Sequence, residues 1–462
     1  MSFKKQKRWA FRLRHVIFTS RAKDRRLRSS SSIAFLSIGG FTTTNSYSTP
    51  WRPEKYSRML AIERGLEIVL SVAKAKDRPD RMASESVPLS ESMSRILRED
   101  IVCDADSPRF DKAIRDGFAV RFEDVAQVPV VLTVIGESRA GAGAEVTVER
   151  GECCEIMTGA PLPDGSNAVV MVENTERISP DSVRILKSVR ENEGLLRRGA
   201  EAREGETLLK GGRRIGLADL GLLASTGKSR VMVSAKPRVA IIATGDELVE
   251  VHENPRPGQI RNSNSYTLYT QVVEAGGSPV LLGIGRDNLQ DLRTKIQLGL
   301  QHDVLLVSGG VSMGKYDLVE TVFAEFEVEV LFDKIAMKPG KPTVFGHRGD
   351  TYVFGLPGNP VSTIVSFHMF VRPLILSLLK AENTKPKTLE AQLEAPAKCD
   401  PERAALVPAL VRFERGQYRI ATAPWKGSSD LAGLSRANAL IMIPRRAGVL
   451  EPGEAVQFLP ME

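Results

Sequence analysis

Three short apolar segments, each ending in a glycine-containing turn, constrain the fold of this chain more than any other feature. They begin the stretches 239–248, 304–317 and 352–362. Short β-branched runs that end in turn residues are typical of buried strands in a parallel sheet. Because ligands of open α/β sheets bind beyond the carboxyl ends of the strands, we expect the three turns to meet at one site.

These turns combine carboxylates, hydroxyls and many backbone N–H groups. That mixture suits a phosphorylated ligand held through a divalent metal ion, because such ions take oxygen ligands from both protein and phosphate. The side chains are those of Asp246, Glu247, Asp317, Thr244, Ser308 and Ser312.

The stretch 308–314 predicts an anion-binding turn. Glycine reaches backbone angles that other residues avoid, and a bare backbone lets an anion approach successive N–H groups. A tight strand-to-helix turn is the alternative. However, Asp317 follows closely, and a carboxylate beside a bound phosphate requires a cation between them, so we expect Asp317 to bind a metal ion. The candidate residues of the turn are Ser308, Gly309, Gly310, Ser312 and Gly314.

Two further segments are candidates for anion contact. Residues 357–360 precede an expected helix, whose dipole and unpaired N–H groups favour an anion, although a rigid turn would look the same. Lys334, Lys338 and Lys341 lie close together beside prolines that stiffen the backbone, and an exposed basic turn is the alternative. The residues of the first segment are Pro357, Gly358, Asn359 and Pro360.

Acidic residues also follow the first expected strand. Asp246 and Glu247 are placed to bind a metal ion or to perform acid–base chemistry, while a helix N-cap is the alternative for Asp246. Asp116 and Thr158 lie in stretches that by themselves predict only turns. The sequence contains no Ser/His/Asp arrangement and no GxxxxGK[ST] segment, and its five histidines show no metal-ligand spacing.

The 462 residues exceed what one core accommodates, and the pattern predicts a multidomain protein of the α/β plus β class. Strands and helices alternate in the middle of the chain, as a parallel sheet requires, whereas the flanking regions contain short strands and turns. The expected divisions are an N-terminal extension over 1–55, a linking helical and β domain from 56–104 and 207–235, a mostly β module over 105–206, an α/β domain over 236–384 and a C-terminal β domain over 385–462.

Helical periodicity predicts several helices. A second short helix, capped by Ser90 or Ser92 and carrying Met93, Ile96 and Leu97, follows the first. The other expected helices cover 58–75, 217–225, 265–275, 289–300 and 361–379.

Charge and cysteine content exclude several classes of protein. The net charge of +8 comes from the first 50 residues, which hold eleven Lys or Arg and one acidic residue. The rest of the chain carries a net charge of −2, so its charge gives no indication of a basic surface that binds nucleic acid. The four cysteines lack metal or disulfide spacing, and the pair Cys153-Cys154 fits core packing. No apolar run approaches the ~20 residues of a membrane span. The basic extension is typical of an organellar transit peptide, a disordered tail or a start codon placed too early.

Five ordered motifs over about residues 56–462 resemble the molybdopterin molybdenumtransferases, the MoeA type, also found as the E domains of gephyrin and its plant counterpart. The chain resembles the family at 108–119, at 156–163, at 244–248 with 258–264, at 308–314, and at 338–342 with 355–360; residues 435–438 resemble a C-terminal signature. The resemblance implies a three-layer, MogA-like molybdopterin-binding domain, a mostly β module and a small C-terminal unit resembling a β-barrel.

The resemblance implies a late step of molybdenum cofactor synthesis. The expected reaction inserts molybdate into adenylylated molybdopterin and releases AMP, with Mg²⁺ as cofactor. The family's catalytic positions correspond to Asp116, Thr158, Glu247, Asp287 and Asp317, and we expect metal binding by Asp317, Asp246 and Glu247. Its substrate-binding positions add Glu201 and Arg403 to the glycine, lysine and proline residues named above.

The resemblance also implies partners and location. In the family, Asp116 and Thr158 reach the site across a homodimer interface, and transient contacts with the adenylyltransferase and with apo molybdoenzymes are expected. We expect neither nucleic acid nor membrane as a partner, and a cytoplasmic protein unless the N-terminal segment directs it to an organelle.

Several positions depart from the family pattern. Lys112 replaces an asparagine and Arg115 often a methionine, Asn262 replaces an aspartate that is a candidate metal ligand, and Pro408 falls where many members have a second arginine. Glu201 also stands where the family usually has aspartate.

Two other functions remain open from the sequence. The preceding adenylyltransferase resembles the α/β domain alone, and the β module with Asp116 and Thr158 argues against it. A non-catalytic molybdopterin-binding carrier or scaffold would be expected to lose acidic site residues, and this chain retains Asp116, Glu247, Asp287 and Asp317.

Overall fold

The computed structural model describes residues 59–75, 83–142, 145–310 and 318–461. The basic N-terminal extension therefore lies outside the described residues, and so do three of the predicted site residues, Ser312, Gly314 and Asp317.

A six-stranded sheet forms the α/β domain in the order β16-β13-β17-β21-β20-β18. The first four strands run parallel, as predicted, but β20 runs opposite to them, and β18, which pairs antiparallel with β20, runs in their direction again. The reason is local: only Gly349 and Asp350 separate β20 from β21, and so short a connection can form a hairpin but not a crossover. The bounds are β13 Arg238–Thr244, β16 Ser278–Gly285, β17 Val304–Ser308, β18 Glu329–Phe332, β20 Val344–Arg348 and β21 Thr351–Leu356.

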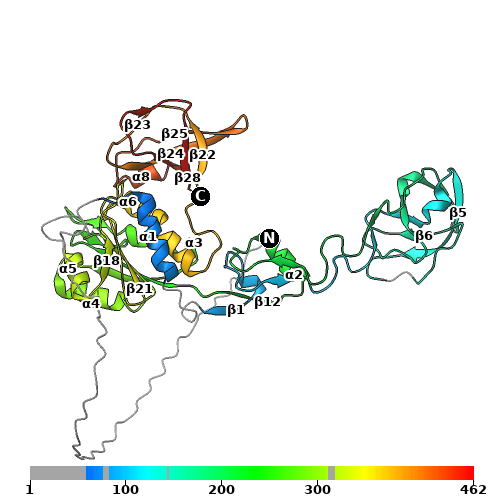
Figure 1. The fold of residues 1–462 in the computed structure, drawn as a ribbon, viewed down its shortest axis with the longest axis horizontal. Coiled ribbons are helices and arrows are strands. Elements are labelled where there is room, and N and C mark those ends of the chain that lie inside the picture. Colours follow the sequence, from blue (N-terminus) through cyan, green and yellow to red (C-terminus); the bar gives the residue numbers. More distant parts are fainter. Residues whose placement is uncertain (1–58, 76–82, 143–144, 311–317, 462) are drawn as a thin grey trace, which may run out of the picture. The chain divides into compact units, whose positions relative to one another are not determined.

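Helices cover both faces of this sheet and make the three layers that the sequence predicted (Figure 1). Successive side chains of a strand point to opposite faces. Val239 and Ile241 accordingly join one core, and Ala240 and Ile242 join the other. The first face is covered by α1 Ile62–Ala75, α3 Asn264–Ala275, α6 Pro360–Ser366 and α7 Arg372–Leu378, and the second by α4 Leu289–Gly299 and α5 Leu318–Glu325.

The helical segment Pro360–Leu378 is long and strongly apolar. It comprises α6, a π-helical turn at Phe367–Val371 and α7. At 19 residues it is long and apolar enough to span a membrane, contrary to the expectation that no run approaches that length, but 89% of its most apolar window is buried. Its side chains pack against the sheet as a core helix does.

The first helix begins at Ile62, four residues later than the periodicity predicts. Leu60 instead forms a bridge with Ile335, in which its N–H donates to the Lys334 carbonyl and its carbonyl accepts from Ala336. Extended pairing of the chain at this point excludes helical geometry.

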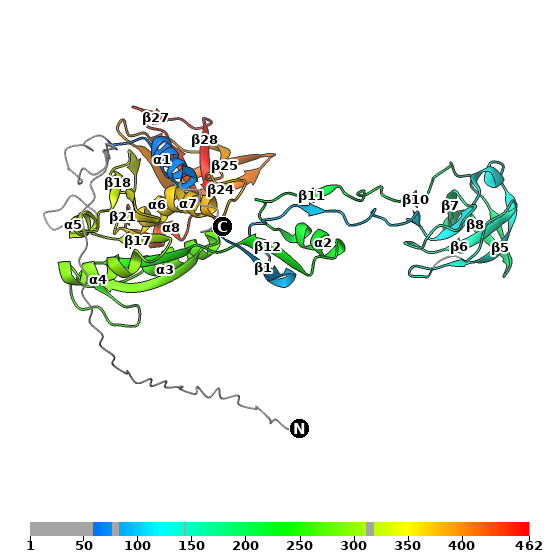
Figure 2. The ribbon, with the colours of Figure 1, turned by 60° about the horizontal axis from the view of Figure 1, so that its bottom comes forward.

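A small linking domain forms around the antiparallel pair of β1 Ser84–Pro88 and β12 Arg230–Ser234, with α2 Leu217–Ser225 beside it (Figure 2). The predicted short helix carrying Met93, Ile96 and Leu97 is wrong: only a 3-10 turn forms, at Leu89–Glu91.

Long-range pairing overrides the helical pattern in this segment. Ile96 and Leu97 pair with Arg214 and Val233, and Ser94 has a φ of +64°. Ser92 contributes only a local bond, from its hydroxyl to the Leu89 carbonyl.

The mostly β module contains a six-stranded sheet in the order β7-β4-β6-β5-β9-β8. Cys153 and Cys154 lie in β6 and face its two separate cores. Burial raises the pKa of Cys153 to about 12 and that of Cys154 to about 11, so both thiols stay protonated at neutral pH. The bounds are β4 Gly117–Val120, β5 Val130–Ser138, β6 Glu152–Ile156, β7 Ala168–Met171, β8 Thr175–Ser179 and β9 Ser182–Ile185.

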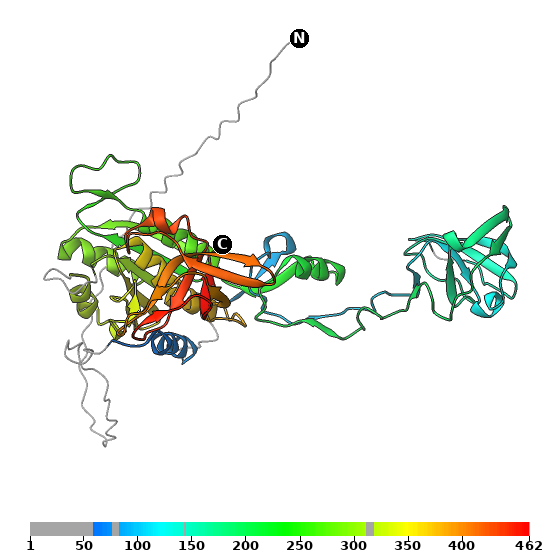
Figure 3. The same ribbon diagram turned by 90° about the horizontal axis from the view of Figure 1, so that it is seen from above.

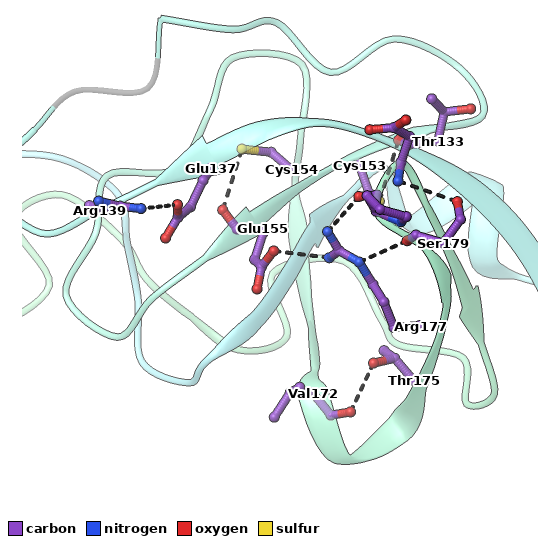
Figure 4. Close-up of polar contacts among 12 residues, drawn as sticks. Thr133, Glu137, Arg139, Cys153, Cys154, Glu155, Val172, Thr175, Arg177 and Ser179 are labelled. Atoms are coloured by element: carbon purple, nitrogen blue, oxygen red, sulfur yellow. Dashed lines mark hydrogen bonds and ion pairs between the residues drawn. The ribbon is translucent and has the colours of Figure 1, made fainter.

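An arginine supports this sheet beside the cysteines (Figure 4). The Arg177 guanidinium donates to the Glu155 carboxylate at 2.9 Å and to the Ser179 carbonyl at 3.1 Å. It also lies 5.6 Å from the centre of the Phe118 ring. Both thiols are buried, which agrees with core packing.

The C-terminal domain is a closed barrel, as predicted. Its strands follow the order β24-β25-β22-β28-β26, and β26 pairs back with β24, so none of the five has an unpaired edge. These strands appear in orange to red in Figure 3. β19 (Met337–Lys338), which comes from the α/β domain, pairs with β24. The bounds are β22 Leu389–Leu393, β24 Ala404–Glu414, β25 Gln417–Thr422, β26 Ala439–Ile443 and β28 Ala455–Pro460.

Candidate functional site

Two aspartates pair at the carboxyl ends of the adjacent parallel strands β13 and β16. The Asp246 N–H donates to Oδ2 of Asp287 at 3.3 Å, and the Asp287 N–H donates to Oδ1 of Asp246 at 3.1 Å. Asp246 does not cap a helix, because the short strand Leu248–Val249 follows it. The reciprocal bonds fix the two carboxylates beside each other and leave one oxygen of each unused by this exchange.

Arg286 holds the loop that carries these aspartates. Its guanidinium donates to the carbonyl oxygen of Leu248 at 3.0 Å and to that of Asp246 at 3.4 Å. Glu247 folds back over Gly245, whose φ is +145°, and a Cβ on that glycine would collide with the Glu247 carboxylate. The third acidic side chain therefore lies at the same strand end.

The glycine turn after β17 has the geometry that its sequence predicts. Gly309 and Gly310 have φ values of +98° and +63°, which favour glycine, and the Gly309 N–H donates to the Leu356 carbonyl at 3.0 Å. A Cβ on either glycine would come within 3.0 Å of the Thr244 hydroxyl oxygen. Thr244 is buried, and its hydroxyl has no partner among the described residues.

Asn264 joins this turn to the next one and was not singled out from the sequence. Its Nδ2 donates to Ser308 Oγ at 2.9 Å and to the Gly358 carbonyl at 2.8 Å, and it lies 3.4 Å from Thr363 Oγ1. Its place at the end of the motif 258–264, just after a strand, was the signal available in the sequence.

Asn262 belongs to the start of α3. Its Nδ2 donates to Ser265 Oγ at 2.9 Å, and its Oδ1 accepts from the Ser265 N–H at 3.2 Å. The side chain is buried and uses both its donor and its acceptor. The position where the resemblance implied a metal ligand therefore has a structural role in this chain.

The proline loop after β21 contacts the C-terminal domain. Asn359 Nδ2 donates to Ser428 Oγ at 3.0 Å, and the Val361 N–H donates to the Ser428 carbonyl at 3.0 Å. Thr363 Oγ1 donates to the carbonyl oxygens of Pro357 and Asn359 from inside α6. The N–H of Val361, at the helix start that was expected to face an anion, therefore already has a partner. No feature of the sequence indicated Ser428.

The three predicted lysines differ in environment. Lys334 is largely buried, and its Nζ lies 3.5 Å from Oδ2 of Asp333. Lys338 and Lys341 are exposed. Glu320 on α5 interacts with Asp333 and Lys334. Burial, followed by the charge of Asp333, raises the pKa of Glu320, while the charge of Lys334 lowers it.

The β module brings Asp116 and Thr158 into direct contact. The Thr158 N–H and hydroxyl both donate to Oδ1 of Asp116, at 2.6 and 2.8 Å, and these bonds hold the pKa of Asp116 below its usual value. Both side chains are exposed. Gly117 is required beside them, because a Cβ there would collide with the Val170 carbonyl.

Glu201 is occupied by neighbours within the β module. Ser107 Oγ donates to its Oε2 at 2.8 Å, and Lys112 Nζ lies 3.5 Å from its Oε1. Two positions that depart from the family pattern, Lys112 and Glu201, thus form an ion pair with each other.

Arg403 lies where the barrel joins the α/β domain. It donates to Oδ2 of Asp400 at 3.1 Å, and the Ala404 N–H donates to the Ala336 carbonyl at 3.0 Å. Backbone N–H bonds from Glu402 and Arg403 and the Arg403 charge lower the pKa of Asp400. The Arg403 Nε is buried and without a partner in the described part of the chain.

The acidic strand ends suit magnesium in their chemistry. Among the described residues no cluster of three or more His, Cys, Asp or Glu is arranged to hold a metal ion. Mg²⁺, however, is commonly held by one or two carboxylates together with substrate phosphates. Asp246 and Asp287 retain oxygens for that purpose, Glu247 adjoins them, and Asp317 lies outside the described residues.

The family comparisons match three consecutive regions. Residues 60–227 match "MoeA N-terminal region (domain I and II)", residues 240–377 match "Probable molybdopterin binding domain", and residues 390–461 match "MoeA C-terminal region (domain IV)".

Characterised relatives extend this likeness over most of the chain. A molybdopterin molybdenumtransferase of Bacillus subtilis (strain 168) is 36% identical over 81% of this chain and 89% of its own length. One of Staphylococcus aureus (strain N315) is 33% identical over 82% and 92%. Two structures of a Pyrococcus horikoshii molybdopterin biosynthesis MoeA protein cover 88% and 87% of this chain and all of their own, at 32% and 29% identity with TM-scores of 0.70 and 0.73. The chain belongs to the MoeA family of molybdopterin molybdenumtransferases.

Proposed function

We propose that this protein inserts molybdate into adenylylated molybdopterin and releases AMP. The observation that carries the proposal is the convergence of the Asp246–Asp287 pair, the glycine turn and the proline loop at the carboxyl ends of four parallel strands. Relatives that carry the name of this activity are up to 36% identical among those compared. Ligands of open α/β sheets bind at that end, so one ligand contacts all three loops.

Each loop has a distinct task in this proposal. The glycine turn offers backbone N–H groups to a phosphate oxygen, and Lys334, Lys338 and Lys341 attract the phosphate and molybdate anions. The proline loop, whose conformation is fixed by Ser428 and Thr363, forms a rigid wall of the site. Rigid placement matters because catalysis in such a site rests on positioning and on stabilising developing charge.

The acidic residues act at the phosphoanhydride in this proposal. Asp246 and Glu247, with Asp317, would hold Mg²⁺, which would polarise the phosphoryl oxygen and offset developing charge. Asp287 holds Asp246 in place through the exchanged N–H bonds. Arg403 and Glu201 are proposed as more distant substrate contacts, Glu201 through the lysine that it binds.

We also propose a homodimer in which Asp116 and Thr158 of one copy complete the site of the other. Support comes from their surroundings, because several exposed side chains near them are apolar. Val172, whose N–H donates to the Asp116 carbonyl, is 49% exposed, and Ile114 and Met157 are 44% and 36% exposed. Exposed apolar groups around a polar pair are typical of a surface that a second protein covers. A cytoplasmic location and transient contacts with the adenylyltransferase and with apo molybdoenzymes complete the proposal.

The proposal is tested by supplying the full-length protein with adenylylated molybdopterin, molybdate and Mg²⁺. We expect AMP release together with reconstitution of an apo molybdoenzyme, and at least about a 100-fold loss of both in Asp287→Asn and in Asp116→Asn. Mixing the two variants should restore part of the activity if the sites form between two copies. Binding of the substrate without AMP release or reconstitution would overturn the proposal and support the carrier function.

A further inference from the structure

A buried amide forms hydrogen bonds with both the glycine turn and the proline loop. Asn264 opens α3, and its side chain reaches Ser308 at the end of β17 and Gly358 after β21. Four parallel strands place these loops at one edge, but strand pairing ends at Ser308 and Leu356. We propose that Asn264 is a positioning residue that sets the spacing between the two loops in the transferase, an inference that rests on the proposed function.

Contacts between the loops make their spacing matter. A Cβ on Gly358 would lie 3.6 Å from the Cα of Gly309, so the two backbones are nearly in contact. The Gly309 N–H also bonds to the Leu356 carbonyl. Displacement of one loop therefore displaces the other, and in a site that works by positioning, a shift of about 1 Å can reduce the rate ~100-fold.

The chemistry at this position requires an amide. Nδ2 supplies both of its hydrogens, to the hydroxyl of Ser308 and to the carbonyl of Gly358. An aspartate of the same shape has no hydrogen for the Gly358 carbonyl and would place a charge against it. Ser308 and Thr363, which surround the amide, are themselves buried.

The acceptor end of the amide supports a role in the site. Oδ1 of Asn264 is buried and has no partner among the described residues, and the same is true of the Thr244 hydroxyl beneath the glycine turn. Buried polar atoms are rarely left unpaired, because each carries a desolvation penalty. Two such atoms lie beside the two loops.

The test compares Asn264→Asp and Asn264→Ala with a matched control, Asn262→Ala. Asn262 is also a buried amide, two residues away, but its side chain bonds to Ser265, in the first turn of α3, and among the described residues to neither loop. Amide hydrogen exchange in residues 308–310 and 356–359 is measured on the full-length protein without ligand. Affinity for molybdopterin, AMP release and the midpoint of thermal unfolding are then measured for the same variants.

We expect both Asn264 variants to exchange about 10-fold faster in the two loops and to release AMP ~100-fold more slowly. Asn262→Ala should leave exchange in these loops unchanged. Unchanged exchange in the Asn264 variants, or an equal effect of Asn262→Ala, overturns the inference. Ser308→Ala, which removes the bond from Asn264 together with the bond from the Ser308 hydroxyl to the Pro357 carbonyl, tests the connection between the two loops if the other variants do not fold. Wild-type protein that releases no AMP would instead refute the proposed function, and the exchange measurement would still decide the role of Asn264.

Discussion

The two groups of candidate site residues are stabilised in different ways. At the carboxyl edge of the sheet, Asn264 and Ser308 are buried, and the Asn264 side chain bonds Ser308 and lies 3.4 Å from Thr363, 99 positions along the chain. In the β module, Asp116 and Thr158 are exposed, and among the described residues the hydrogen bonds of their side chains are to each other. The first group is preorganised by contacts across the fold, whereas the second is shaped by a turn and faces solvent.

Glycine substitutions should separate the two groups most strongly. Gly309→Ala and Gly159→Ala both add a Cβ at positive φ, +98° and +82°, which has a penalty of about 1–2 kcal/mol. A Cβ on Gly309 would collide with the carbonyl and hydroxyl oxygens of Thr244, whereas among the described residues a Cβ on Gly159 would contact only Ala140, at 4.0 Å. We expect Gly309→Ala to lower the free energy of unfolding by about 1–3 kcal/mol more than Gly159→Ala does, as measured by urea unfolding. Equal losses would show that the sheet edge is as adaptable as the turn.

The next effect concerns the titration of Asp116. Two bonds from Thr158 lower its pKa, so its ionised form stabilises the fold above the unfolded pKa of ~4, and this contribution disappears as the pH falls through the folded pKa. Thr158→Val removes the hydroxyl bond and retains the N–H bond. The pKa should therefore rise towards the usual value, as followed by carbon NMR of the carboxyl group.

Thr158→Ser is the control for this titration, because it keeps a hydroxyl. An Asp116 titration that is identical in Thr158→Val and in the wild type would show that the hydroxyl bond is absent in solution.

The smallest effect should come from Glu201→Gln. The ion pair with Lys112 is partly exposed, at 51% for the Glu201 side chain and 28% for that of Lys112, and pairs of this kind are worth about 0–1 kcal/mol. We expect a change of stability within that range and a weaker affinity for the anionic substrate if Lys112 loses its position. Lys112→Gln should have the same effect on affinity, and a double variant no worse than either single variant would confirm that the two act together.

The sequence predicted the parts of the fold that depend on local pattern. The strands at Val304–Ser308 and Thr351–Leu356 and the helices at Leu217–Ser225 and Leu289–Gly299 follow from hydrophobic periodicity and turn residues. The segment around Ile96 was misread as a helix because its apolar spacing suits one. Ile96 instead pairs with Arg214, which lies far along the chain, and hydrophobic periodicity carries no information about such distant partners.

The same distinction applies to the site. Glycine turns and acidic strand ends identified Gly309, Asp246 and Glu247, because their chemistry is visible in short motifs. Asn264 and Ser428 were missed, because their contacts are made across the fold. For Asp116 and Thr158 only a family resemblance gave a signal, since two exposed turns carry no physical sign that they belong together.

The bonds between the proline loop and Ser428 have a consequence for engineering the molecule. Asn359 and Val361 belong to the α/β domain, but their partner belongs to the barrel, and β19 likewise pairs with β24. The C-terminal domain is therefore not a detachable module. A chimera that exchanges this barrel for that of a relative has to carry a compatible hydroxyl and carbonyl to the same place, or the wall of the neighbouring site loses its shape.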